Sequence, residues 1–307
     1  LSLLLVAAGV RRAGPARRVA LAGALVLVFL VAARPSTAAR VGEARLVALD
    51  VGQGDSFLLV TEKGRVLVDG GGTFDAAYDF GRTRLLPRLA ALGTVSFDAV
   101  VLTHPHPDHT RGLLAVLKLL PVGRLVLPRG APRNEFLDEV LSAATGGRPA
   151  ETLGAGDRFV AAGVAFDVLH PGPDAYPRAA ENNGSLVLAL RLSGRRILLT
   201  GDVEAAAEAD LLARGVDLAA DVLKVPHHGS RTSSTPELLA RVSPRLALVG
   251  VGRRNRFGHP APEVVSRLRS AGAAVFRTDR HGDVSLLFRG GKVFPSRPFA
   301  GLPGGIP

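Results

Sequence analysis

Four side chains of the kinds that bind divalent cations lie within six residues of this sequence, in the stretch LTHPHPDHT: His104, His106, Asp108 and His109. An apolar, strand-like run over residues 98–102 precedes them and an apolar helical pattern over 110–120 follows, so we expect a strand-to-helix loop. Three imidazoles this close would repel one another when protonated, whereas a bound cation uses them as ligands. The stretch therefore predicts a metal site rather than a His-rich surface loop.

The composition limits which ligands and partners are available. The chain has no cysteine, so any metal must be held by histidine and carboxylate, without thiolates or disulfides. With 307 residues, 47% of them hydrophobic, it is long enough for one large domain or two small ones. The net charge is +11, but six arginines and no acid fall within residues 1–40, which leaves +5 for the rest. That mild excess suits a polyanionic substrate and equally an ordinary solvated surface.

An uncharged apolar segment, Val19 to Ala33, lies between two arginines before it and Arg34 after it. It is slightly shorter than the about 20 residues that cross a bilayer core, a difference that flanking arginines can make up. A signal peptide or a buried helix would give the same pattern. We expect a transmembrane helix with cytoplasmic arginines before it, so that the chain leaves the membrane on the outer face.

The chain starts inside an apolar run and without methionine, so we expect a piece of a longer protein of the cell membrane. On this interpretation residues 1–43 are the end of a transmembrane region and a linker. Residues 44–294 form the main domain, on the extracellular side, and the Gly/Pro-rich residues 295–307 form a loose tail.

Strand patterns begin each half of that domain, and strand–helix alternation follows in both. Residues 45–51, 56–61 and 65–69 are rich in Val and Leu and separated by Gly-containing turns, and a second β-rich block covers 164–200. Helical periodicity appears between and after these blocks. This order predicts an α/β fold in which two mixed sheets pack face to face with helices outside.

Two later strand ends offer further ligands. Asp202, in LLTGD, follows a buried strand, and its two oxygens suit a bridge between two cations, although an Asp there also suits a helix N-cap. His227 and His228, in LKVPHHGS, follow another apolar strand. Neighbouring side chains point in different directions, so we expect His227 to be a ligand and His228 to contact the substrate or a ligand. Asp69, in LVDGG, is expected to orient a metal-bound histidine, and a turn-forming role competes with that interpretation.

Together these residues resemble the metallo-β-lactamase superfamily: the H-x-H-x-D-H pattern is met at 104–109, the later acid and histidine by Asp202 and His227, and the early strand-end acid by Asp69. Several stretches also resemble the C-terminal domain of ComEC-type competence proteins, membrane channels that carry transforming DNA into bacteria. These stretches are LDVGQGDS (49–56), THPHPDHT (103–110), NNGSLVL (182–188), LLTGD (198–202), LKVPHHGS (223–230) and FGHP (257–260).

The resemblance implies a four-layer αββα sandwich and a nuclease that cleaves the phosphodiester bonds of the non-transported DNA strand. It implies two divalent cations, Zn or Mn, held by the residues of the 104–109 cluster with Asp202 and His227. The implied partners are single-stranded DNA, the membrane through the upstream channel, and other competence proteins. Two alternatives stay open: a hydrolase of small esters or choline phosphate with the same fold, and a domain that binds DNA or gates the channel without cutting it.

One departure from the superfamily pattern concerns a further histidine ligand expected before Asp202. The comparable position falls near Glu181 and Asn182, while His170 lies earlier, at the end of the preceding strand. Either His170 moves in, or an oxygen of Glu181 or Asn182 substitutes, or one cation is held weakly. Oxygen ligands would shift the preference from Zn toward Mn or Mg.

The remaining candidates concern catalysis and substrate binding. Asp108 is a candidate catalytic residue, and His228 and His259 are candidate general acids because imidazole titrates near neutral pH. The VGQGDS turn would border the cleft, and other polar side chains would bind phosphate or lie behind the ligands. These second-layer or substrate candidates are Gln53, Asp55, Asp69, Asn182, Asn183 and Ser230.

Overall fold

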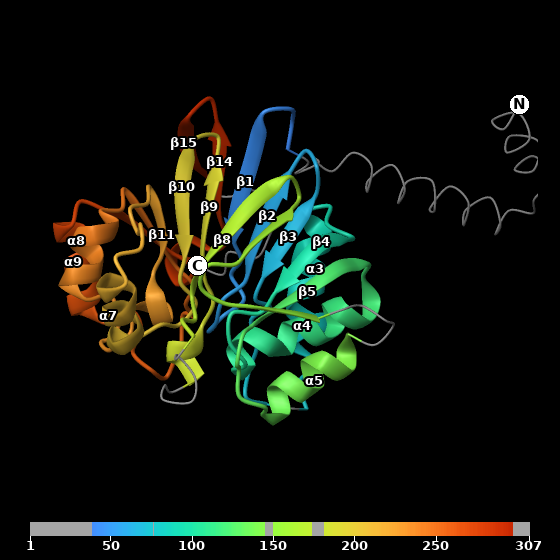
Figure 1. Ribbon diagram of the computed structural model, residues 1–307. Coiled ribbons are helices and arrows are strands. Elements are labelled where there is room, and N and C mark those ends of the chain that lie inside the picture. The colour runs from blue at the N-terminus through green and yellow to red at the C-terminus, as the bar shows by residue number, and fades with distance from the viewer. Residues whose placement is uncertain (1–38, 76, 145–149, 174–180, 297–307) are drawn as a thin grey trace, which may run out of the picture. The chain divides into compact units, whose positions relative to one another are not determined.

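Two β-sheets lie face to face between two groups of helices (Figure 1). The first sheet takes its first six strands from the early part of the chain and its last two from the end, and the second sheet takes the strands between them. The computed structural model describes residues 39–75, 77–144, 150–173 and 181–296. The eight-stranded sheet has the order β15-β14-β1-β2-β3-β4-β5-β6, and the seven-stranded sheet has the order β13-β12-β11-β10-β9-β8-β7.

The element bounds are as follows. The first sheet contains β1 Glu43–Ala48, β2 Phe57–Thr61, β3 Arg65–Val68, β4 Phe97–Val101, β5 Val122–Pro128, β6 Ala150–Leu153, β14 Val284–Arg289 and β15 Lys292–Ser296. The second contains β7 Arg158–Ala161, β8 Val164–His170, β9 Val187–Leu192, β10 Arg195–Leu199, β11 Val222–Lys224, β12 Leu246–Val249 and β13 Ala274–Arg277. The helices are η1 Gly81–Leu85, α3 Leu86–Ala91, α4 Pro107–Leu119, α5 Glu135–Ala143, η2 Glu181–Gly184, α7 Ala205–Ala213, η3 Pro226–Gly229, α8 Pro236–Val242, α9 Pro262–Ser270 and α10 Thr278–His281.

Each sheet is antiparallel in one part and parallel in the other. β1, β2 and β3 form an antiparallel meander, and β3 to β6 run parallel. In the second sheet, β7 to β10 are antiparallel and β10 to β13 parallel. Parallel strands need cover on both faces, which explains why β4 and β11 come from nearly continuous apolar runs.

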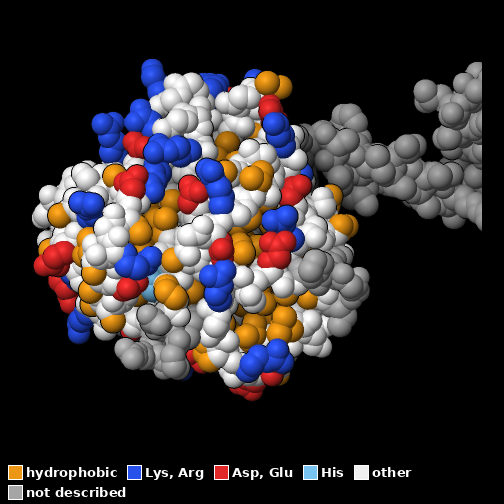
Figure 2. Space-filling view, viewed as in Figure 1, with side chains coloured by type: hydrophobic (Ala, Val, Ile, Leu, Met, Phe, Trp, Pro, Cys, Tyr) orange, Lys and Arg blue, Asp and Glu red, His pale blue; other side chains and the backbone are white. Residues whose placement is uncertain are grey.

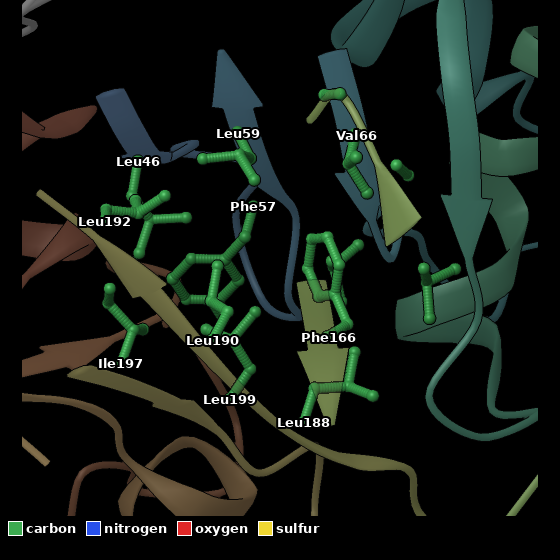
Figure 3. Close-up of a cluster of buried hydrophobic side chains, with 14 of the residues drawn as sticks. Leu46, Phe57, Leu59, Val66, Phe166, Leu188, Leu190, Leu192, Ile197 and Leu199 are labelled. Carbon is green, nitrogen blue, oxygen red and sulfur yellow. The ribbon is translucent and has the colours of Figure 1, made fainter. Parts of the chain in front are cut away.

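The main core lies between the two sheets. Phe57 and Leu59 of β2 point toward Phe166 of β8 and Leu190 of β9 (Figure 3). Phe159 stacks on Phe166 with ring centroids 4.7 Å apart. These positions alternate along their strands with residues that face the helices, so each strand contributes to two apolar layers.

Helices cover the outer face of each sheet. α3, α4 and α5 pack on the first sheet, and α7, α8 and α9 on the second (Figure 1). The expected α/β sandwich of two sheets with outer helices is therefore confirmed. The sequence patterns had not predicted β6, β7 or β15. Pro295 and Ser296 belong to β15 and pair with β14, although we expected the tail to be loose from residue 295. The wider division into domains at 43 and 294 stays a prediction.

The expected membrane span, Val19 to Ala33, lies outside the described residues. Within residues 39–296, leaving aside the gaps at 76, 145–149 and 174–180, no helix is both long enough and apolar enough to cross a membrane.

Candidate metal centre

The predicted ligands lie at strand ends of both sheets. Asp69 follows β3 and the 104–109 cluster follows β4, its parallel neighbour. Asp202 follows β10, and the two adjacent histidines follow β11, which is parallel to β10. Because parallel strands end at one edge of a sheet, each pair of loops is brought together. Because the two sheets pack face to face, these two pairs of loops meet and form one centre.

Four ligand atoms converge at the buried part of this centre. Nε2 of His109 lies 3.3 Å from Oδ2 of Asp202, and Nε2 of His228 lies 3.1 Å from the same oxygen. Oδ2 of Asp108 lies 3.4 Å from Nε2 of His228. Two imidazole nitrogens and two carboxylate oxygens this close suit a single divalent cation.

Two further carboxylates hold the histidines from behind. Oδ2 of Asp69 lies 2.8 Å from Nδ1 of His109, and Oδ1 of Asp55 lies 3.4 Å from Nδ1 of His228. Asp69 is itself fixed by the backbone N–H and the hydroxyl of Thr103, which donate at 2.8 and 2.7 Å. The Asp69 carboxylate at Nδ1 of His109 sets the tautomer of that histidine and leaves its Nε2 for a cation, whereas the approach of Asp55 to His228 lacks hydrogen-bonding geometry.

A second, more exposed group of potential ligands lies beside the buried group around Asp202. His104 is fully buried, and its Nε2 has no hydrogen-bond partner. His106, whose ring centroid is 4.7 Å from that of His104, is 32% exposed at its side chain, and its Nε2 lies 2.7 Å from Oε2 of Glu181. Two imidazoles and an adjacent carboxylate could hold a second cation with an exposed side.

His170 does not reach the centre. Its Nε2 lies 2.7 Å from the carbonyl oxygen of Asn183, and its Nδ1 lies 3.4 Å from Oδ2 of Asp210. Of the residues considered for the further ligand, the structure brings Glu181 to His106 and leaves His170 outside. Asn182 lies on the rim, with Nδ2 3.5 Å from Nε2 of His227.

The donor set fits divalent cations. Asp55, His109, Asp202 and His228 each bring a potential ligand atom within 4.8 Å of the others. Among them we favour His109, Asp202 and His228 as ligands, because one oxygen of Asp55 contacts Lys224 and the other faces Nδ1. The buried ring nitrogens of His228 lack hydrogen-bonding geometry to their neighbours. Buried polar atoms without partners are costly unless an ion or water satisfies them.

The electrostatics of the centre favour positive charge. Burial lowers the pKa of His109, but the facing carboxylates of Asp202 and Asp69 outweigh it and raise the pKa to about 10. The pKa of His228 is likewise raised, because Asp202 and Asp55 outweigh the effect of burial. His104 behaves in the opposite way, since burial and the neighbouring His109 hold its pKa well below the usual value. A divalent cation would take the place of the protons on His109 and His228.

Lys224, which sequence reasoning missed, is part of the same network. Its side chain is only 2% exposed, and Nζ contacts Oδ2 of Asp55 and lies 3.0 Å from Oδ1 of Asp202. It also donates to the carbonyl oxygen of Gly201. A lysine inside the otherwise apolar strand β11 was the available signal, because a lysine is almost never fully buried without a partner.

The structure favours the opposite roles for the two adjacent histidines from those that we expected. Both have positive φ, 47° for His227 and 53° for His228, so the chain turns sharply and their side chains diverge. His228 enters the buried group, whereas Nδ1 of His227 lies 3.2 Å from Oε1 of Glu204 on the rim. The geometry therefore favours His228 over His227 as a ligand, which reverses the roles that we expected, and the identity of the ligands stays a prediction.

The other candidates lie around the centre rather than in it. His259 has its ring centroid 5.6 Å from that of His227, and burial together with His227 lowers its pKa to about 4, which makes it a poor proton donor at neutral pH. Oε1 of Gln53 accepts from the backbone N–H of Gly252 at 3.4 Å. The side chain of Asn183 accepts from backbone N–H groups at the start of α7, and the Ser230 hydroxyl pairs with that of Thr232.

Glycines after β3 and in α4 let the loop after β3 lie directly on α4, whose first turn carries candidate ligands. A Cβ on Gly72 would stand 1.9 Å from the carbonyl oxygen of Pro107, and one on Gly112 would stand 1.9 Å from that of Gly70. The backbone N–H of Gly70 donates to the carbonyl oxygen of His109 at 2.8 Å. The LVDGGG stretch thus fixes the first turn of α4, where the ligands are.

The sequence model of the family described as Metallo-beta-lactamase superfamily matches residues 49–253 of this chain. The chain belongs to this superfamily. The match begins before the VGQGDS turn and ends beyond the histidines after β11, so it includes every part of the centre described above.

Two curated relatives of this chain are named as a ComE operon protein and a competence protein. ComE operon protein 3 of Bacillus subtilis is 34% identical over 260 residues, which cover 80% of this chain and 33% of that protein. Competence protein ComA of Neisseria gonorrhoeae is 35% identical over 269 residues, covering 87% of this chain and 36% of that protein. The resemblance to ComEC-type proteins is thereby confirmed. The chain spans about a third of the length of these relatives.

Solved structures agree on the fold. CmlA, a diiron beta-hydroxylase from Streptomyces venezuelae, superposes with a TM-score of 0.52 over 79% of this chain and 54% of its own, at 14% sequence identity. At that identity the likeness concerns the sandwich alone.

Proposed function

We propose that this chain is a metal-dependent phosphodiesterase that cleaves single-stranded DNA, and that it degrades the non-transported strand during competence DNA uptake. One observation carries the chemistry: Nε2 of His109 and Nε2 of His228 both lie close to Oδ2 of Asp202, and a carboxylate oxygen of Asp108 lies close to Nε2 of His228. The names of the curated relatives support the biological setting.

Divalent cations held here would supply an activated water and the positive charge that a phosphodiester needs during hydrolysis. The chain's own residues fix the place of attack. His106 and Glu181 are 32% and 34% exposed at their side chains, whereas His109, His228 and Asp202 are nearly sealed. The phosphate group therefore approaches from the side of His106, with the buried group beneath it.

The test measures cleavage of a 5′-labelled single-stranded oligonucleotide by the full chain, purified in detergent and supplied with Mn²⁺, Mg²⁺ or Zn²⁺. We expect cleavage that requires a cation and that Asp108→Ala abolishes. The control is Asp167→Ala, an exposed aspartate of β8 that pairs with Arg158. Cleavage by chelated protein or by Asp108→Ala at the wild-type rate would refute the proposal.

The same preparation separates the alternatives. Hydrolysis of a small carboxylic ester or of a choline phosphodiester without cleavage of DNA would favour a different substrate class. Binding of DNA with no hydrolysis of any substrate would favour a non-catalytic domain. Analysis of bound metal by mass spectrometry decides between one cation and two.

We further propose that the domain stands on the outer face of the cell membrane, held by the apolar segment Val19 to Ala33. The arginines that flank this segment support that orientation by the positive-inside tendency. Protease added to intact cells should then remove the domain, and complete protection would refute the placement.

A further inference from the structure

A row of alternating aromatic and cationic side chains leads away from the metal centre. The ring of His259 lies 5.6 Å from that of His227 and stacks on Phe257, with centroids 5.8 Å apart and planes inclined by 17°. The guanidinium of Arg256 lies 5.3 Å above the ring of Phe257 and 5.3 Å from that of Phe74. We call Phe74, Arg256, Phe257 and His259 the aromatic row.

The row joins loops from the two sheets. Phe74 belongs to the loop after β3, and the other three residues belong to the loop after β12. Asn255 closes the second loop: its Nδ2 donates to the carbonyl oxygens of Gly252 and His259 at 3.0 and 2.8 Å, and its Oδ1 accepts from the N–H of His259 at 2.9 Å. The part of the row in the loop after β12 is therefore held in place by hydrogen bonds before any ligand arrives.

The aromatic rings are exposed, which is unusual for side chains of this size. Phe74 is 57% exposed and Phe257 is 48% exposed. The same two loops border a cavity of about 460 Å³, to which they contribute Tyr78 and Arg253. Exposed apolar rings beside an open hollow indicate a surface that contacts a ligand.

The part of the row that follows β12 is positively charged. The face drawn in Figure 2 carries lysine and arginine side chains interspersed with acidic ones, so net charge alone marks no single binding surface there. Residues 250–262, in contrast, contain Arg253, Arg254 and Arg256 and no carboxylate. Arginine beside exposed aromatic rings is the chemistry that binds single-stranded nucleic acid, since bases stack on the rings and phosphates pair with the guanidinium groups.

We propose that the aromatic row is a binding track for single-stranded DNA, on which bases stack against Phe257 and Phe74 while Arg256 pairs with a phosphate. The inference rests on the proposed phosphodiesterase, because it places nucleotides next to the scissile bond. His259 is the member of the row that contacts His227 at the rim of the centre, and it stacks with Phe257, so its role is to hold that ring. The row tolerates any base sequence, because every base has a stacking face.

The first test measures binding by fluorescence anisotropy, with a labelled oligothymidylate of about 12 nucleotides and no divalent cation. Phe257→Ala and Phe74→Ala should each weaken binding roughly 5- to 150-fold, the range for loss of one stacked base. Arg256→Gln should lower the slope of log affinity against log salt by about 0.7, the value for one phosphate contact on a single strand.

The chain contains a matched control pair. Arg289 lies 5.5 Å over the ring of Phe294, which is 40% exposed, in the β14–β15 hairpin. Phe294→Ala and Arg289→Gln should leave binding unchanged. Equal losses in the row and in the control pair would overturn the proposal, and so would wild-type binding by both row phenylalanine variants.

A second measurement separates this proposal from the proposed function. The row variants should hydrolyse bis(p-nitrophenyl) phosphate as the wild type does, because that small ester does not reach the row, while KM for the oligonucleotide rises. If the wild type binds oligonucleotide through the row and cleaves nothing, the phosphodiesterase is refuted and the track stands. If the wild type cleaves and the row variants bind normally, the track is refuted.

Binding to phosphatidylglycerol vesicles tests a membrane surface instead. Loss of vesicle binding by the row variants with unchanged DNA binding would assign the row to a membrane surface and also overturn the proposed DNA track.

Discussion

Replacing Lys224 by methionine should destabilise the protein strongly, because it removes one charge from a buried network of three. The stem of the side chain keeps its volume, while Asp55 and Asp202 lose the ammonium that contacts both. All three side chains are at most 3% exposed, so water cannot replace the lost partner. Breaking such a buried pair costs about 3–5 kcal/mol. For a domain of this size that corresponds to a fall in Tm of roughly 6–20 °C.

The assay is thermal and denaturant unfolding of the chelated protein. Lys118→Met, at an exposed position of α4, is the control and should change stability by at most about 0.5 kcal/mol. The double variant Lys224→Met/Asp55→Asn should lose less than the sum of the two single losses, with a coupling of about 1–3 kcal/mol. Additive losses, or a Lys224→Met protein as stable as the wild type, would refute the idea that Lys224 neutralises these carboxylates.

Three further predictions concern other parts of the molecule. Burial lowers the pKa of His170 in the folded protein. As pH falls below about 6.5, this histidine is therefore protonated in the unfolded chain before it is protonated in the folded one, and the stability of the fold decreases until the pH reaches the lower folded pKa. His170→Gln should flatten the fall in Tm between pH 7 and 5, and an unchanged fall would contradict this assignment. Gly112→Ala, whose Cβ would meet the carbonyl oxygen of Gly70, should cost about 1–3 kcal/mol and weaken cation binding by calorimetry, whereas Gly172→Ala, with its nearest atom at 3.5 Å, should do neither. Asn255→Ala removes the hydrogen bonds that close its loop and should weaken oligonucleotide binding with little change in Tm; tight binding by this variant would show that the loop does not need to be fixed in advance.

The sandwich could be predicted largely because its signals are local. The strand ends that carry Asp69, Asp202 and the 104–109 cluster show as apolar runs that stop at a glycine or a polar residue. β6 and β7 were not predicted because each has only four residues. More exposed and more buried positions alternate along both strands, so neither gives a continuous apolar run. β15 contains Pro295, which lowers strand propensity except at an edge, and there it pairs only with β14.

The centre was predicted less completely than the fold, since its details depend on backbone turns and distant contacts. No sequence pattern shows that His227 and His228 both have positive φ, which decides which of them enters the buried group. The role of Lys224 depends on Asp55, which comes from the other sheet's loops. The aromatic row could not be predicted because Phe74 and Phe257 lie far apart in the chain. They come together where the guanidinium of Arg256 contacts both rings.

The charges of the centre bear on which substrate it suits. Five carboxylates line it: Asp55, Asp69, Asp108, Asp202 and Glu181. Lys224 balances one of them, so four negative charges remain. One divalent cation would leave two negative charges, which would repel a phosphodiester, whereas two divalent cations would balance all four. Since unbalanced buried charge is costly, occupancy by two cations and access for an anionic substrate are expected to occur together.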